Sequence, residues 1–77
     1  MIVWHVCSHK KLTKYLRTGH IVPPVRAWET IDDAQRFSLL TGRRLILRLR
    51  FPDNAPKLEG HGGRARVMHQ SVKVEGI

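Results

Sequence analysis

The segment from residue 43 to residue 51 alternates basic and apolar side chains with a period of two. Successive side chains of a β-strand point to opposite faces of its sheet, so this segment predicts a strand that is buried on one face only. The buried face would carry Leu45, Leu47, Leu49 and Phe51. The other face would carry Arg44, Ile46, Arg48 and Arg50. A fold of this chain must therefore hold a sheet with one apolar side and one arginine-rich side.

Two helices are expected from the residues that start and stop them. Ser8 and Thr30 are typical N-cap residues, because their hydroxyl groups accept hydrogen bonds from the first free N–H groups of a helix. Gly19 and Gly42 suit the left-handed backbone that commonly ends a helix. We therefore expect helices over residues 9–17 and between Thr30 and Gly42. The inward stripe of the second helix would consist of Ile31, Ala34, Phe37 and Leu40.

Short apolar and β-branched runs indicate further strands. They cover residues 1–6, 20–22, 25–28, 65–69 and 71–74, and the last two would form a hairpin that turns near Gln70. The expected fold class is α+β, with two short helices packed on one face of a small curved mixed or antiparallel sheet of four to five strands. The expected core consists of Ile2, Trp4, Val6, Leu12, Leu16, Val25, Trp28, Ala34, Phe37, Leu45, Leu47 and Leu49.

The chain of 77 residues has room for a single small domain over residues 1–77. Residues 52–63 form a long connection rich in proline and glycine, and connections of this length are usually functional or poorly ordered. Cys7 is the single cysteine, which excludes an internal disulfide and a cysteine-based zinc site. No apolar run reaches the roughly 20 residues that cross a bilayer, and no signal peptide is visible. We expect a cytoplasmic protein with no membrane association.

The net charge is strongly positive, since 14 Lys and Arg against 6 Asp and Glu give +8 at pH 7. A field of this sign favours anionic partners, nucleic acid before an acidic protein. Arginine suits phosphate because its planar guanidinium donates two parallel hydrogen bonds. The alternative is a solvated sheet face on which arginine stems cover apolar neighbours. The candidate nucleic-acid or phosphate-binding residues are Arg43, Arg44, Arg48, Arg50, Arg64 and Arg66.

Other sequence patterns give weaker evidence for a binding or catalytic site. The loop over residues 58–64 has three glycines that would let backbone N–H groups approach an anion, but it matches no Walker or dinucleotide motif, and a flexible connector is the alternative. The five histidines lack the spacing of a metal site, so no metal is expected. Trp4 and Trp28 are expected to be core anchors rather than base-stacking platforms. No acid, base and nucleophile can be assembled, which favours a binding function over catalysis.

The run from Trp4 to Ser8, followed by a helix that ends near Gly19, resembles the opening of ADP-ribosyltransferase-like domains. Residues 32–38 and the apolar strand after them are similar to the next helix and strand of that family, so the resemblance covers roughly the first two thirds of the chain. It implies a minimal domain that binds NAD as cofactor. It further implies that His5 contacts the ribose of NAD and that Arg26 lies near the pyrophosphate.

Three functions stay open at this point. The first is a module that binds nucleic acid or an acidic protein through its arginines, and the charge favours it. The second is a minimal ADP-ribosyltransferase-like domain, for which His5 is the candidate catalytic residue. The third is a small interaction or regulatory subunit whose partner, or second copy in a homodimer, covers part of the sheet.

Overall fold

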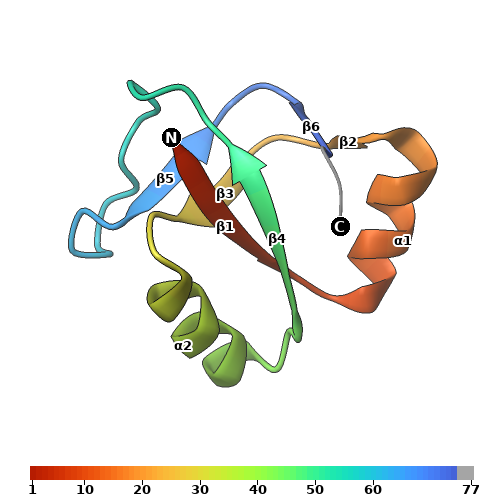
Figure 1. Cartoon of the computed structure of the whole chain (residues 1–77), viewed down its shortest axis with the longest axis horizontal. Coiled ribbons are helices and arrows are strands. Elements are labelled where there is room, and N and C mark those ends of the chain that lie inside the picture. The colour runs from red at the N-terminus through yellow and green to blue at the C-terminus, as the bar shows by residue number, and fades with distance from the viewer. Residues whose placement is uncertain (75–77) are drawn as a thin grey trace.

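The structure, a computed structural model of the chain, describes residues 1–74. Its centre is a four-stranded sheet of strand order β4-β1-β3-β5, and β2 and β6 form a separate two-stranded sheet (Figure 1). Two helices accompany these strands, so the expected α+β class is confirmed. The elements are β1 (Ile2–Cys7), α1 (His9–Thr18), β2 (His20–Ile21), β3 (Val25–Trp28), α2 (Ile31–Thr41), β4 (Leu45–Arg50), β5 (Ala65–Met68) and β6 (Val72–Lys73).

β1 lies inside the larger sheet and pairs antiparallel with both β3 and β4. Its pairing with β4 runs the full length of both strands, from Ile2 opposite Arg50 to Cys7 opposite Leu45. β5 pairs antiparallel with the other side of β3. Of the mixed and antiparallel arrangements expected from the sequence, the antiparallel one is therefore confirmed.

The main core lies on one face of this sheet. Val3 of β1 points to this face together with Leu47 and Leu49 of β4, as the alternation of β4 predicts. α1 covers the face through Tyr15, and Ile21 of β2 joins the same apolar cluster. The largest fully buried side chains of the described residues are Val3, Ile21, Val25, Leu49 and Phe51.

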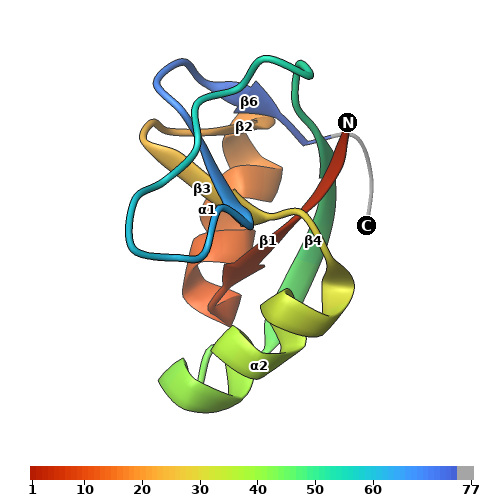
Figure 2. The same cartoon turned by 90° about the vertical axis from the view of Figure 1, so that its left-hand side faces the viewer.

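The two helices contact opposite faces of the sheet, which corrects the expectation that both pack on one face. Tyr15 of α1 contacts His5, whereas Phe37 of α2 contacts Trp28. His5 and Trp4 are neighbours in β1 and so point to opposite faces, and Trp28 is paired with Trp4. Figure 2 shows α1 and α2 on different sides of β1. Both faces carry large apolar side chains, and a different helix packs on each face.

Both helices start and stop at the capping residues that the sequence indicates. The hydroxyl groups of Ser8 and Thr30 each accept a hydrogen bond from the backbone N–H three residues later, at 3.3 and 3.2 Å. Gly19 and Gly42 end the helices with φ of 79° and 75°, in the left-handed region that favours glycine. Within residues 1–74 neither helix is long and apolar enough to span a membrane.

Leu16 of the expected core, and Ile31 and Leu40 of the expected inward stripe, lie at the surface instead. Leu16 is 60% exposed and Leu40 is 80% exposed, and Ile31 is also accessible. Each helix is short and meets the sheet along a narrow line, so α1 buries Tyr15 and α2 buries Ala34. The apolar residues that flank these two contacts are left facing solvent.

The expected hairpin of β5 and β6 is not formed. β5 pairs with β3 in the larger sheet, while β6 pairs with β2 in the smaller one, where Val72 lies opposite Ile21. The two strands are close in sequence, but each completes the edge of a different sheet. A short apolar run shows that a strand forms without showing which strand it pairs with.

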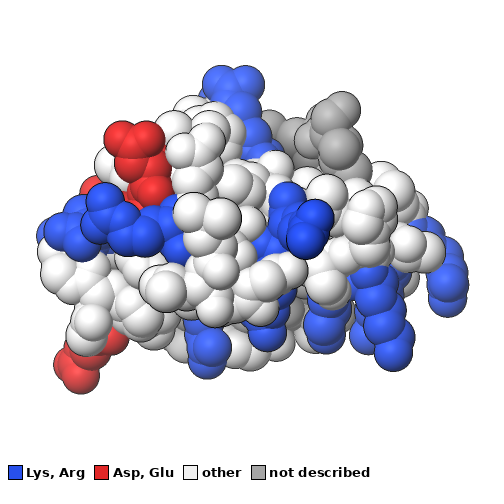
Figure 3. Space-filling model, turned by 90° about the horizontal axis from the view of Figure 1, so that it is seen from below, with Lys and Arg blue, Asp and Glu red and all other residues white. Residues whose placement is uncertain are grey.

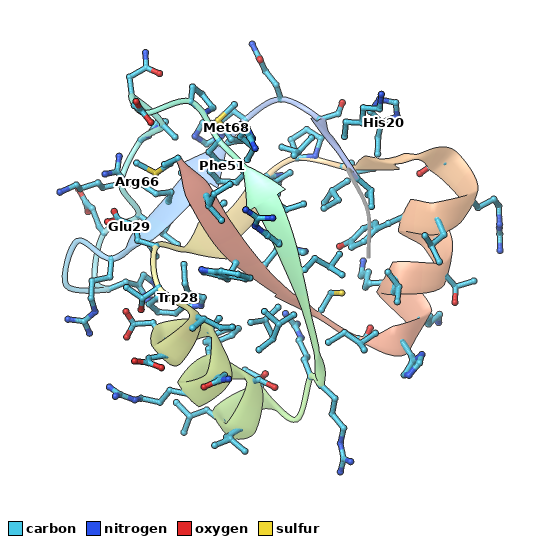
Figure 4. All side chains as sticks on the ribbon, viewed as in Figure 1. His20, Trp28, Glu29, Phe51, Arg66 and Met68 are labelled. Carbon is cyan, nitrogen blue, oxygen red and sulfur yellow. The ribbon has the colours of Figure 1, made fainter. Side chains whose placement is uncertain are left out.

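The long connection between β4 and β5 is held against the sheet. The Val67 N–H of β5 donates to the Pro56 carbonyl at 3.0 Å. The Arg66 guanidinium donates from Nε to Oε2 of Glu29 at 2.6 Å and from Nη1 to the Ala55 carbonyl at 2.7 Å. Figure 4 shows Arg66 and Glu29 side by side at this end of the sheet. One largely buried arginine therefore joins the connection to the segment that leads into α2.

Replacing Thr30 with alanine tests the N-cap of α2. The change removes the hydroxyl that accepts from the Asp33 N–H and donates to Oδ2 of Asp33 at 2.9 Å. We expect the free energy of unfolding to fall by about 1 kcal/mol, the usual loss for an N-cap threonine. Urea denaturation measures the effect. Thr13→Ala, at an exposed position inside α1, is the control and should change the stability little. Equal losses in the two variants would contradict the capping role.

Candidate nucleic-acid interface

The sheet face that carries α2 is only partly covered. Across the pairing of β1 with β4, Trp4 lies opposite Arg48 and Ile2 lies opposite Arg50. Both arginine side chains are exposed, and Trp4 and Ile2 are half-buried. We call these four residues the β1–β4 basic face. Arg48 and Arg50 are two residues apart on β4, so their Cα atoms lie about 7 Å apart, beside the half-buried Trp4.

Trp4 is a residue that the sequence analysis assigned to the core. The structure instead leaves it half-buried, at the centre of the basic face. The alternation along β1 does not separate it from the core, because Val6 shares its face and is buried. The register with Arg48 is what makes Trp4 part of a site, and that register depends on long-range pairing.

The guanidinium groups of the basic face are available to a ligand. The ion pairs among residues 1–74 join the N-terminus to Asp53, Arg64 to Asp33 and Arg66 to Glu29. None of them involves Arg48 or Arg50. Figure 3, seen from below, shows Lys and Arg side chains along most of that side of the molecule and acidic side chains gathered at one end. Arg48 and Arg50 thus have no carboxylate partner within residues 1–74, and the net charge of +8 favours an anionic ligand.

The structure brings only part of the expected arginine set together. Arg48 and Arg50 share one face of β4, and Arg44 is exposed just before the strand begins. Arg64 is elsewhere, with its Nε 3.0 Å from Oδ2 of Asp33. Arg66 points to the opposite face of the sheet and is largely buried against Glu29. In the sequence, Arg64 and Arg66 stand beside a glycine-rich loop. That position does not indicate that each of them has a carboxylate partner.

Arg43 lies on the core side of β1 and not with Arg48. Its positive charge acts on His5, Cys7 and Tyr15, where it lowers the pKa of each group. For the Cys7 thiol, burial is the larger effect and raises the pKa. A buried thiol with a raised pKa is a poor nucleophile, so Cys7 acts as a small apolar core residue.

His5 is enclosed between β3 and α1. Its Nδ1 lies 2.6 Å from the Arg26 carbonyl, which can only accept, so Nδ1 carries the proton. Its Nε2 then accepts from the Tyr15 hydroxyl at 3.3 Å. Burial lowers the pKa of His5, although the hydrogen bond to the Arg26 carbonyl raises it, and the charge of Arg43 lowers it further. His5 is therefore a neutral residue at pH 7 with both ring nitrogens engaged.

These contacts define what NAD binding at His5 would require. A ribose hydroxyl could reach the ring only by displacing the Tyr15 hydroxyl or the Arg26 carbonyl. The Arg26 side chain itself is exposed and lies on the other face of the sheet from His5. In residues 1–74, no group of three His, Cys, Asp or Glu side chains is placed to hold a metal ion. NAD binding through His5 and Arg26 stays a prediction.

Comparison with known proteins does not assign the chain to a family. No family model matches it. No curated protein matches it, and no solved structure matches it. The resemblance to ADP-ribosyltransferase-like domains therefore stays a prediction.

The buried neutral His5 predicts that the protein loses stability in acid. In the unfolded chain a histidine has a pKa of 6.5, and in the folded protein the pKa of His5 is lower. Below about pH 6.5 the unfolded state therefore binds more protons than the folded state, and stability present at higher pH is lost as the pH falls through the folded pKa. We expect the urea midpoint to be lower at about pH 5.5 than at about pH 7.5.

His5→Gln tests the origin of this pH dependence. The glutamine amide can donate to the Arg26 carbonyl and accept from the Tyr15 hydroxyl, but it does not titrate. The difference between the two urea midpoints should shrink in this variant. His9→Gln, at an exposed site, should keep the full difference. If His5→Gln keeps it as well, another group causes the acid sensitivity.

Proposed function

We propose that the chain binds single-stranded nucleic acid through the β1–β4 basic face. The observation that carries the proposal is the pairing of Trp4 with Arg48, which places a half-buried indole beside an exposed arginine on one face of the sheet. Single-strand binders combine these two groups, because phosphates need positive charge and unpaired bases need an aromatic surface on which to stack. Arg50 and Arg44 continue the positive charge along the same strand direction.

The shape of the surface favours a single strand over a duplex. The major groove of DNA admits an α-helix or a two-stranded ribbon, whereas the basic face is part of a four-stranded sheet. A duplex would offer phosphates to Arg48 and Arg50 but would give the Trp4 ring no unpaired base. An acidic protein would also pair with the arginines and would leave the indole without a specific partner. A single strand uses all of the groups that the face presents.

Binding of a fluorescent, short single-stranded oligonucleotide tests this function by anisotropy. Three phosphate contacts, from Arg44, Arg48 and Arg50, predict a slope of log affinity against log salt of about −2 for a single strand. Between about 50 and about 200 mM salt, affinity should therefore fall roughly 20-fold. The double variant Arg48→Gln/Arg50→Gln should bind more weakly and lose more than half of that slope, because two of the three contacts are removed.

Two comparisons separate the basic face from the overall charge. Lys14→Gln/Arg17→Gln removes the same charge from the exposed side of α1 and should bind almost as the unaltered protein does. Trp4→Leu should weaken binding about fivefold or more while leaving the salt slope unchanged, since stacking releases no counterions. Equal losses in the two charge variants would show attraction by net charge alone. If an acidic protein binds as tightly as the oligonucleotide, and Trp4→Leu does not weaken that binding, the acidic protein is favoured as the partner instead.

A further inference from the structure

A pocket of about 280 Å³ opens where α2, the end of β3 and the glycine-rich loop meet. We call it the aromatic pocket. Its walls include the rings of Trp28, Phe37 and His61, all of them half-buried. The ring centroids of Trp28 and Phe37 are 5.6 Å apart, and those of Trp28 and His61 are 5.3 Å apart and nearly perpendicular. The pocket therefore presents accessible aromatic surface from three segments of the chain.

The loop that closes this pocket depends on glycine. Gly60 and Gly62 have φ of 82° and 64°, which other residues rarely adopt. A Cβ atom at Gly62 would lie 3.2 Å from the Arg64 guanidinium, so glycine also gives that side chain its room. The Nε of Arg64 is 3.0 Å from Oδ2 of Asp33, and this ion pair ties the loop to the first turn of α2. The loop is thus fixed against α2 by a specific contact.

The chemistry of the aromatic pocket selects one class of ligand. Its volume is near the lower end of ligand pockets, which suits a single planar ring system. The Asp33 carboxylate is neutralised by Arg64, while Arg36 at the rim has no ion-pair partner within the described residues. A planar aromatic group attached to an anion fits this combination of rings and positive charge. A nucleotide is such a group, with its base among the rings and its phosphate toward Arg36.

The pocket adjoins the basic face. Trp28 lies opposite Trp4 in the pairing of β1 with β3, so both indoles are on the same face of the sheet. Figure 4 shows Trp28 between β1 and the start of α2. We infer that the aromatic pocket holds one base of the strand that crosses the basic face, with the adjoining phosphate facing Arg36. This inference rests on the proposed function and adds to it a defined subsite for a single nucleotide.

NMR titration with adenosine monophosphate and with ribose 5-phosphate tests the pocket. The two tryptophans give separate indole N–H signals, one at each site. Adenosine monophosphate should shift the Trp28 signal saturably and leave the Trp4 signal in place. Ribose 5-phosphate carries the same sugar and phosphate without a base, and it should not shift Trp28. Equal effects of the two compounds would mean phosphate binding alone and would overturn the inference.

Variants of the pocket give the second readout. Phe37→Leu removes a ring and should weaken binding of adenosine monophosphate about fivefold or more. His61→Ala removes a ring from the loop without removing core packing, so it serves if Phe37→Leu fails to fold. Leu39→Ala, on the same helix and 85% exposed, is the control and should bind normally. Unchanged affinity in both ring variants would overturn the inference.

The results separate the pocket from the proposed function. If adenosine monophosphate leaves Trp28 unmoved while an oligonucleotide binds with the expected salt slope, the pocket is not a base site and the function stands. If adenosine monophosphate shifts Trp28 but no oligonucleotide binds, the proposed function fails, and with it the inference that the base belongs to a bound strand. Shifts of Trp28 by the mononucleotide and of both indoles by the oligonucleotide support the two together.

Discussion

The rest of the structure depends on the antiparallel pairing of β1 with both β3 and β4. This pairing fixes which residues of β1 face the core and which face away, because one step along a strand reverses the direction of the side chain. Val3 and Cys7 point into the core, and Trp4 points to the other face. A shift of the register by a single residue would bury arginine and expose leucine along the whole of β4, which is why the register is strongly determined.

The two faces of the sheet then have different roles. On one face, α1 and the small sheet of β2 and β6 complete a core that includes Tyr15 and Ile21. On the other face, α2 packs on β1, β3 and β4, and Val6 and Ala34 are buried there. This packing leaves Arg48 and Arg50 exposed and Trp4 half-buried. In a chain of 77 residues, two short helices cannot cover both faces completely. The proposed binding surface is therefore the part of the sheet that the helices leave open.

Local sequence signals predict the elements of this fold well. The caps at Ser8 and Thr30 and the alternation of β4 depend on neighbouring residues alone, and the structure confirms them. Pairing between distant segments is not visible in such signals. The partners of β5 and β6 could not be read from their short apolar runs, and neither could the placement of the helices on opposite faces.

The candidate site was predictable to a similar extent. The exposure of Arg48 and Arg50 follows from the period of two in their own strand. The sequence does not predict that Arg66 is separated from Arg48 and Arg50. That separation depends on the register between β3 and β5 and on the position of Glu29. The role proposed for Trp4 likewise depends on which residue lies across from it in β4. Sites assembled by strand pairing are thus less predictable than the strands that compose them.

The most direct test of this account is an NMR titration of the labelled protein with a short single-stranded oligonucleotide, observing side-chain signals. Arginine Nε–H and tryptophan indole N–H groups report contacts at the side chains themselves, so the two faces of the sheet can be distinguished. The account predicts that the signals of Arg48, Arg50 and Trp4 shift first and most, while that of Arg17 on α1 changes little. Shifts that are largest at Arg17, or spread evenly over the arginines, would contradict it.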